Sequence, residues 1–158
     1  MDTISAAKLI AIPSAFLLSG YYTSASQNSL PLLYKQPASI STPFFTGVYN
    51  RGFAVAVPLT LISTTAFSFL AYSLPAQRTM YAGTAGVVFS ALPFTVAAML
   101  PGINRLMEIG KGGALVQEKA ERSGEVTRLL KAWAAQNWVR MGMSFAGGIG
   151  GLVAAMGV

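Results

Sequence analysis

Two neighbouring apolar segments decide the fold: GFAVAVPLTLISTTAFSFLAYSL (residues 52–74) and MYAGTAGVVFSALPFTVAAML (residues 80–100). Neither holds a charged residue, and each has the length of about 20 residues that a helix needs to cross the bilayer core. Only a short turn containing Pro-Ala-Gln-Arg (residues 75–78) separates them, so they form an antiparallel hairpin. Pro58 and Pro93 lie inside the apolar segments. Membrane helices tolerate such prolines when neighbouring groups satisfy the freed carbonyl.

Two further apolar segments lie on either side of this hairpin, at residues 4–24 and 139–158. The first is the weakest because Lys8 and Pro13 lie inside it. A signal peptide is the alternative, with small residues around Ala25 as its cleavage region, but one Lys and one Asp give it a poor positive charge. We therefore predict a fourth membrane helix here.

The composition agrees with a membrane protein. Hydrophobic residues make up 53% of the 158 residues and charged residues only 10%, against about 25% charged in soluble domains. This balance argues against a soluble enzyme and against a disordered chain. The net charge of +6 comes from cations that flank apolar segments, which is typical of membrane proteins and not of nucleic-acid binding. We predict an all-α integral membrane four-helix bundle, a single domain over residues 1–158.

The sequence contains no Cys and no His. Disulfides, thiolate nucleophiles and thiolate metal ligands are therefore excluded, and the commonest general base and metal ligand is missing. We predict no metal site. Any chemistry must use Arg, Lys, amide, hydroxyl and aromatic side chains and the few carboxylates.

Two long connections, a Pro-rich loop after the first segment and a charged stretch at residues 108–131, are predicted to lie on the same side of the membrane. Four crossings place both termini and the 75–78 turn on the other side. The side with the long connections holds Lys35, Arg51, Arg105, Lys111, Lys119, Arg122, Arg128, Lys131 and Arg140, and the opposite side holds Lys8 and Arg78. The positive-inside rule then predicts cytoplasmic long loops and termini that are lumenal or outside.

The last helix is predicted to begin before the membrane. Val126, Leu129, Leu130 and Trp133 have helical spacing, which favours one long helix that rises out of the bilayer. An interfacial amphipathic helix followed by a bend is the alternative.

The glycine-rich run in this helix, GGIGG (residues 147–151), is predicted to serve packing. No strand precedes it and no Lys-Ser/Thr pair follows, so a nucleotide-binding loop is excluded. Gly147 with Gly151, and Gly150 with Ala154, form small-xxx-small pairs that let membrane helices approach closely. A homo-oligomer through this face is a further hypothesis.

Polar side chains gather at three helix ends that the topology brings to one side. They are Tyr49, Asn50 and Arg51; Asn104, Arg105 and Glu108; and Trp133, Asn137, Trp138 and Arg140. Trp133, Asn137, Arg140 and Ser144 share one helix face, as do Pro101, Asn104 and Glu108. We predict a polar pocket capped by aromatic rings, closed by Tyr49 and the Pro-rich loop. The alternatives are snorkelling anchors, interfacial aromatic residues and, for Asn104, a helix cap.

Three motifs, taken in order, resemble a known family. They are Tyr49-x-Arg51-Gly52 before Pro58; Pro93-Phe94-Thr95 with Met99-x-Pro101-x-x-Asn104-x-Leu106; and Trp133-x-x-x-Asn137-x-x-Arg140. Over residues 9–157 the chain resembles the anthrone oxygenases, small four-helix membrane proteins of fungal polyketide clusters. The resemblance implies oxidation of an anthrone to a quinone by O2 without metal, flavin or another cofactor. It also implies the endoplasmic reticulum as location, although a bacterial plasma membrane would satisfy the charge rule equally well. Many members carry His at the position of Asn137, so the resemblance assigns no shared catalytic base.

The implied chemistry gives each candidate residue a role. Arg140 would stabilise the enolate oxygen, with Asn137 and Asn104 bonding to the carbonyl and hydroxyl groups of the substrate. Glu108 is the candidate base, and a surface ion pair with Arg105 or Lys111 is the alternative for it. The residues predicted to bind the substrate, an apolar aromatic polyketide, are Tyr49, Arg51, Trp133, Arg105 and Trp138. A non-oxidative tailoring enzyme (cyclase, dehydratase or isomerase) and a non-enzymatic membrane scaffold remain alternative functions.

Overall fold

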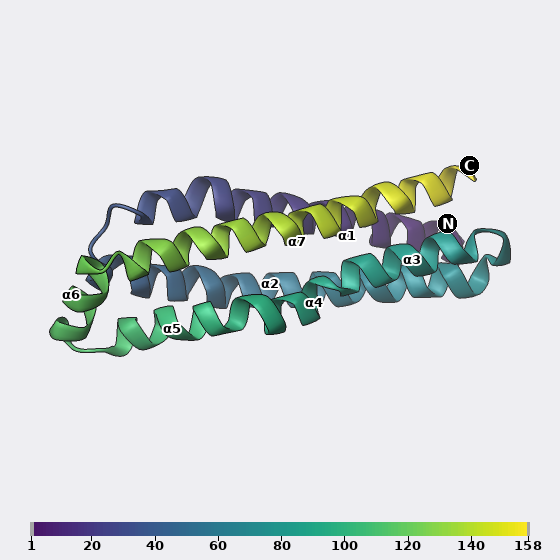
Figure 1. Cartoon of the computed structure of the whole chain (residues 1–158). Helices are drawn as coiled ribbons and strands as arrows, with labels where there is room; N and C mark the ends of the chain where they lie inside the picture. Colours follow the sequence, from purple (N-terminus) through teal and green to yellow (C-terminus); the bar gives the residue numbers. More distant parts are fainter. Residues whose placement is uncertain (1, 158) are drawn as a thin grey trace.

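The computed structural model describes residues 2–157 and shows four long helices side by side (Figure 1). The first is α1 (Thr3–Ser24), continued by the π-helical turn η1 (Ala25–Ser29) and the 3-10 turn η2 (Leu30–Leu33). The second is α2 (Ala38–Ser73), followed by the 3-10 turn η3 (Pro75–Gln77). The third consists of α3 (Arg78–Phe89), α4 (Ala91–Phe94), the π-helical turn η4 (Thr95–Met99) and α5 (Leu100–Lys111). The short α6 (Ala114–Arg122) leads to the fourth, α7 (Glu125–Met156).

Each of these four helices is long and apolar enough to cross a membrane. The prediction of an all-α membrane bundle is thereby confirmed, and the chain is an integral membrane protein. The helical segments have 31 to 37 residues, or roughly 46 to 56 Å at about 1.5 Å per residue. Because the hydrocarbon core is only about 30 Å thick, the bundle is longer than a bilayer core.

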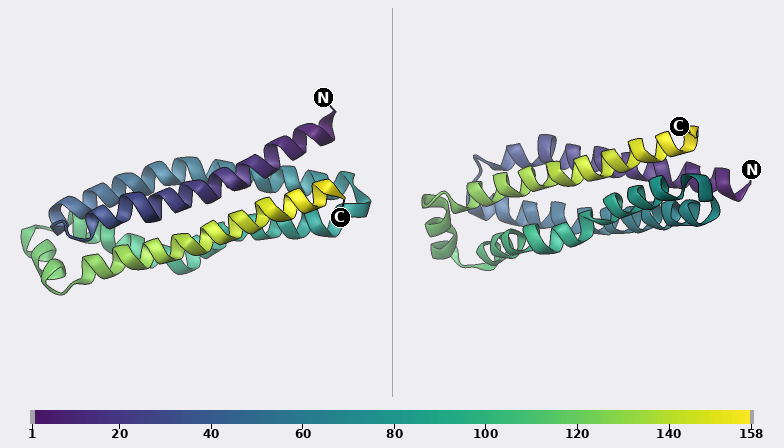
Figure 2. Two further views of the ribbon diagram at one scale, coloured as in Figure 1. Left: turned by 90° about the horizontal axis from the view of Figure 1, so that it is seen from above. Right: turned by 45° about the vertical axis from the view of Figure 1, so that its right-hand side comes forward.

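The ends of the bundle differ. Both described termini and the η3 turn lie at one end, and α6 closes the other (Figures 1 and 2). At the first end Asp2 caps α1 by accepting a hydrogen bond of 2.7 Å from the backbone N–H of Ser5, which lowers the pKa of the Asp2 carboxyl. We call the half of the bundle that contains the η3 turn and both described termini the turn half, and the half that contains α6 the α6 half.

The prediction of two long loops is wrong. The Pro-rich stretch is helical except for residues 34–37, and the charged stretch contains α6. Pro31 lies in the first turn of η2 and Pro37 directly precedes α2, where a missing N–H costs no helical hydrogen bond. Pro37 thus marks the start of α2, whereas Pro31 lies in the 3-10 turn that continues the first helix, so the prolines that suggested a loop are compatible with helical structure.

The last helix is one continuous element from Glu125, as predicted, and Gly124 precedes it with a positive φ of 70°. α7 packs against α1 and α3, and α2 packs against α1 and α3 as well. The α1 segment is thus an integral part of the bundle.

The glycine run packs inside the chain itself. A Cβ atom at Gly147 would lie 2.3 Å from a Val88 methyl group, and one at Gly151 would lie 2.6 Å from the Phe67 ring. The prediction of a packing face is confirmed, and its partners are side chains of the same chain.

Candidate functional site

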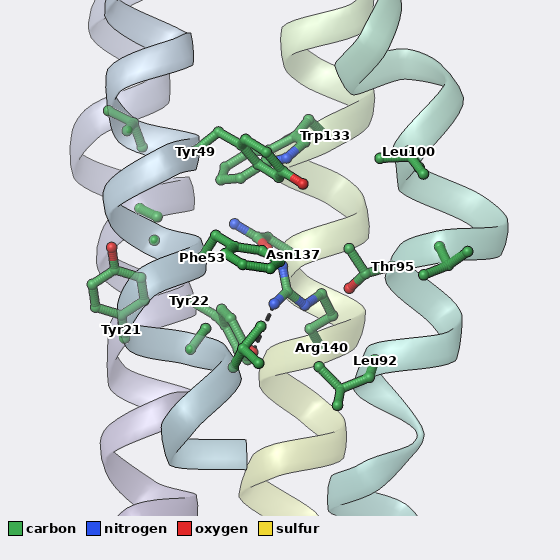
Figure 3. A pocket seen from close by; sticks show the side chains of 16 residues that line it. Tyr21, Tyr22, Tyr49, Phe53, Leu92, Thr95, Leu100, Trp133, Asn137 and Arg140 are labelled. Carbon is green, nitrogen blue, oxygen red and sulfur yellow. Dashed lines mark hydrogen bonds between the residues drawn. The ribbon is translucent and has the colours of Figure 1, made fainter. Parts of the chain in front are cut away.

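A cavity of about 370 Å³ lies between the four helices, where the turn half meets the α6 half (Figure 3). This volume falls within the range of about 300–1,000 Å³ found for ligand sites. Its lining residues are Tyr21, Tyr22, Ala25, Val48, Tyr49, Gly52, Phe53, Ala56, Val57, Leu92, Thr95, Val96, Leu100, Trp133, Asn137 and Arg140. The wall is mainly aliphatic and aromatic, with its charge confined to one side.

That side is the inward face of α7. Trp133, Asn137, Arg140 and Ser144 recur at intervals of three and four residues, which places them on one face of a helix. All four are buried, Asn137 to 1% and Arg140 to 8% exposure. The predicted shared face is therefore confirmed, and the first three of these residues line the cavity.

Arg140 is held by two polar side chains. Its Nη2 donates a hydrogen bond of 2.7 Å to the Tyr22 hydroxyl, and its Nη1 donates one of 3.1 Å to the Asn137 Oδ1 (Figure 3 shows the three residues). The guanidinium carbon also lies 4.0 Å from the centre of the Tyr22 ring. Nε has no hydrogen-bond partner among the described residues. The guanidinium is thus fixed in place but retains donor capacity.

No anionic side chain accompanies this buried cation. The acidic side chains of the chain are Asp2, Glu108, Glu118, Glu121 and Glu125, and none of them lines the cavity. Ion pairs among residues 2–157 involve Arg105 and Arg122 only. A buried charge without a charged partner is costly. The arrangement therefore favours an electron-rich oxygen of a ligand beside Arg140.

Aromatic rings form the α6 side of the cavity. The buried Phe45 ring contacts Trp133 edge-on, with 5.4 Å between centroids, and stacks on Tyr49 at 6.4 Å. The Phe53 ring is tilted against the Tyr49 ring, with 6.4 Å between their centroids. The indole N–H of Trp133 is buried and has no acceptor in the described structure. These rings give the cavity walls suited to a flat aromatic ligand.

The opposing wall comes from the π-helical turn η4. Pro93 and Pro101 bracket it in sequence, and the Thr95 hydroxyl donates a hydrogen bond of 2.7 Å to the carbonyl of Ala91. Gln136 of α7 donates one of 2.9 Å to the Ala98 carbonyl. π-helical turns are rare and often occur at functional sites. Here the turn places Thr95 and Val96 at the cavity.

Four of the predicted site residues come together at the cavity: Tyr49, Trp133, Asn137 and Arg140. The two predicted catalytic residues of the third helix, Asn104 and Glu108, do not. They lie exposed on the outer face of α5, where Arg105 pairs with Glu108 at 3.5 Å and with Glu125 at 2.8 Å.

The reason for this placement is the apolar face of α5. Ile103, Leu106 and Ile109 are fully buried, and burying them turns the polar face away from the bundle. Arg51 and Trp138 are also exposed and do not line the cavity. Arg51 and Trp138 directly neighbour the lining residues Gly52 and Asn137 in sequence, but they lie on other faces of their helices.

Sequence reasoning missed several lining residues, above all Tyr22. Its signal was available: the first apolar segment ends in two tyrosines, at the membrane side to which the topology also assigns Arg140. Gly52, which also lines the cavity, leaves room for the Tyr21 side chain, because a Cβ at position 52 would lie 3.3 Å from the Tyr21 hydroxyl. Among the described residues, no group of three or more Asp or Glu side chains could hold a metal ion.

The profile of the Anthrone oxygenase family matches residues 45–150, which include all three motifs and lie within the predicted range of 9–157. The chain therefore belongs to the anthrone oxygenase family, as the motifs indicated. No curated protein and no solved structure matches the chain.

Proposed function

We propose that this member of the anthrone oxygenase family oxidises a flat, anthrone-type aromatic polyketide to a quinone with O2. The family membership supports a membrane-associated role in polyketide tailoring. The observation that carries the specific proposal is the buried guanidinium of Arg140, which has no carboxylate partner and faces an aromatic-lined cavity. A site of this kind complements a flat apolar molecule with one oxygen that becomes negatively charged during the reaction.

The reaction requires a carbon acid and little else. The CH2 group of an anthrone is doubly benzylic, and loss of its proton gives an aromatic, phenolate-like enolate. The enolate passes one electron to O2, and the resulting carbon radical combines with superoxide to a peroxide. Protonation gives the hydroperoxide, which loses water to leave the quinone carbonyl. One O2 is consumed, with one oxygen atom in the quinone and the other in water.

Arg140 has the main role in this scheme. A preorganised cation beside the developing negative charge stabilises the enolate in a site that water does not screen. The Asn137 amide, held by its bond to Arg140, and the Tyr22 hydroxyl fix the direction of the guanidinium. Trp133 and Tyr49 are the rings positioned to stack on the substrate.

The scheme also needs an acceptor for the proton that the CH2 group loses. Glu108 was the sequence candidate, but it is exposed on α5 with its carboxylate in an ion pair with Arg105. Since no Asp or Glu side chain lines the cavity, the proposal assigns proton removal to hydroxide. Arg140 then accelerates the step by lowering the free energy of the enolate.

We further propose that the α6 end faces the cytoplasm and that the membrane is the endoplasmic reticulum. Exposed cations at this end include Lys35, Arg105, Lys119, Arg122 and Arg128, which supports cytoplasmic sidedness by the positive-inside rule. The endoplasmic reticulum follows from the family resemblance alone. A cysteine introduced at Lys119 and labelled from one side of sealed microsomes would test the sidedness.

The test of the activity is a coupled measurement in nanodiscs. Purified protein would receive a simple anthrone while O2 uptake and quinone absorbance are followed together. We expect one O2 per quinone, at a rate above the spontaneous oxidation and unaffected by metal chelators. Quinone formation at the spontaneous rate for a panel of anthrones would contradict the proposal.

A second candidate function, non-oxidative tailoring of a polyketide, uses the same polar residues of the cavity. The Arg140–Asn137–Tyr22 arrangement would equally stabilise an enolate during a cyclisation, dehydration or isomerisation. This non-oxidative tailoring consumes no O2. Turnover of a polyketide intermediate under strict anaerobiosis, with the same dependence on Arg140, would favour it over the oxygenase.

A further inference from the structure

The cavity has an opening whose position says how a ligand reaches it. Two of its lining residues, Phe53 of α2 and Val96 of η4, are themselves largely exposed on the outside of the bundle, at 57% and 64%. Arg140 and Asn137, on the opposite wall, are buried. The cavity therefore runs inward from the seam between α2 and η4. In Figure 3, Phe53 and Thr95 face each other across this seam, with Arg140 behind them.

The seam is a window and not a slit along the whole bundle. α2 packs against α3 and α4 on the turn side and against α5 on the α6 side, so α2 and the third helix close the seam at both ends. Between these contacts the third helix consists of the π-helical turn η4. The distorted segment and the opening thus coincide.

The other routes into the cavity are closed. Towards α6, the contacts of Phe45 with Trp133 and Tyr49 form an aromatic barrier. Towards the turn half, Gly148 and Gly151 bring α7 into close contact with Phe16 and Phe67. An aqueous ligand the size of an anthrone would have to displace these packed rings.

The window lies at membrane depth. Residues 52–73 of α2 and 79–104 of the third helix contain no charged side chain, and they form the belt that lipid can cover. Val96 lies nine positions before Arg105, roughly 13 Å along a helix. Phe53 lies close to Arg51, at the edge of the belt, where the long Arg side chain can reach the head groups. The mouth therefore opens into the outer part of the hydrocarbon core.

We propose that the cavity exchanges its ligands laterally with the bilayer through the window between Phe53 and Val96. This inference rests on the proposed function and defines its substrate class: flat aromatic molecules that are dissolved in the membrane near the head groups. Such molecules combine an apolar ring system with hydroxyl groups, and they favour this depth as Tyr and Trp side chains do. The ring system enters edge-first, and the polar edge reaches Arg140.

A binding experiment tests the window without relying on turnover. The chain has two tryptophans, so Trp138→Phe leaves Trp133 as the only one, at the cavity wall. Anthraquinone dissolved in nanodisc lipid would quench Trp133 fluorescence as it binds, and stopped-flow mixing would give its association and dissociation rates. Val96→Phe fills the window. We expect it to slow both the association and the dissociation of anthraquinone several-fold, because it hinders passage in both directions.

The matched control is Val55→Phe on α2, an exposed valine in the same belt that does not line the cavity. It should change neither rate. Phe53→Ala widens the window and should accelerate both. Unchanged rates in Val96→Phe would overturn the proposal, and so would a weaker affinity at an unchanged association rate, which would make Val96 a binding contact only.

A second measurement keeps the window testable if anthraquinone does not bind, an outcome that would count against the proposed function instead. Because the chain lacks cysteine, a nitroxide can be attached to a single cysteine at Val96, and for comparison at Gln36 in the exposed connection before α2. We expect O2, which concentrates in lipid, to relax the label at 96 more than a water-soluble nickel chelate does, with the reverse at 36. Stronger relaxation at 96 by the nickel chelate would place the opening in water and overturn lateral exchange.

Discussion

The two halves of α7 both face the bundle, but one packs tightly against its neighbours and the other borders a cavity. In the turn half, Gly147 and Gly151 leave no room even for a methyl group beside Val88 and Phe67. In the α6 half, Trp133, Asn137 and Arg140 border a cavity of about 370 Å³. One helix thus provides a glycine seam at one end and a polar wall at the other.

The difference shows how a small membrane protein can carry a cavity at all. Helices in lipid gain little from hydrophobic burial and associate through close packing of small residues. A cavity forfeits such contacts. Dense packing in the turn half therefore holds the four helices in register, and the α6 half can carry a hollow and a buried charge.

The largest effect is expected for Arg140→Met, which removes the charge and keeps an apolar side chain of similar length. Loss of one preorganised donor to a developing oxyanion typically costs about 10²–10³ in kcat. Stability should not fall correspondingly, because the variant removes the cost of burying a charge that has no charged partner. Anthrone turnover and thermal unfolding in nanodiscs, measured on the same preparation, check both expectations.

The matched control for this variant is Arg128→Met, which removes an exposed cation from the same helix and should leave turnover unchanged. An Arg140→Met protein that is inactive only because it unfolds would make Arg140 a structural residue and break the division between the two halves. Full activity in that variant would remove the guanidinium from the mechanism.

The turn half should respond in the opposite way. Gly147→Leu places a side chain where a Cβ alone would lie 2.3 Å from Val88, and overpacking of this kind costs about 1–3 kcal/mol. We expect a lower unfolding temperature, with kcat per folded molecule retained. Gly142→Leu is the control, since a Cβ at Gly142 meets nothing within 4 Å. Equal stability of the two variants would contradict the glycine seam.

These halves also differ in how far the sequence predicted them. The glycine spacing and the face shared by Trp133, Asn137 and Arg140 follow from helical periodicity, which is local. The sequence wrongly placed Asn104 and Glu108 in the site, because the spacing shows that they share a helix face but not whether that face turns inward. The buried Ile103 and its apolar neighbours decided that. Tyr22 was missed because its partner Arg140 is 118 positions away, and only the packing of α1 against α7 joins them.

A smaller effect is expected for Tyr22→Phe, which sharpens the role of the polar wall. The variant keeps the ring under the guanidinium but removes the hydroxyl that accepts the 2.7 Å bond from Arg140. We expect a loss of about 1–2 kcal/mol in transition-state stabilisation, a factor of about 5–30 in rate. Steady-state kinetics with an anthrone measure it. Tyr21→Phe is the control, because the structure shows no hydrogen bond from the Tyr21 hydroxyl to Arg140, and a similar loss there would count against the specific contact.

The smallest effect is expected for Glu108→Gln, and it separates the two accounts of the base. As the general base that the sequence suggested, Glu108 would be needed for proton removal, and general base catalysis contributes about 10²–10⁴ in rate. In the structure its side chain is 67% exposed and paired with the half-exposed Arg105 at 3.5 Å, a type of surface pair worth about 0–1 kcal/mol. We therefore expect turnover within about twofold of the parent and an unfolding temperature almost unchanged. A loss of a hundredfold would mean that α5 presents its other face during catalysis, and that the α6 half rearranges where the glycine-packed half cannot.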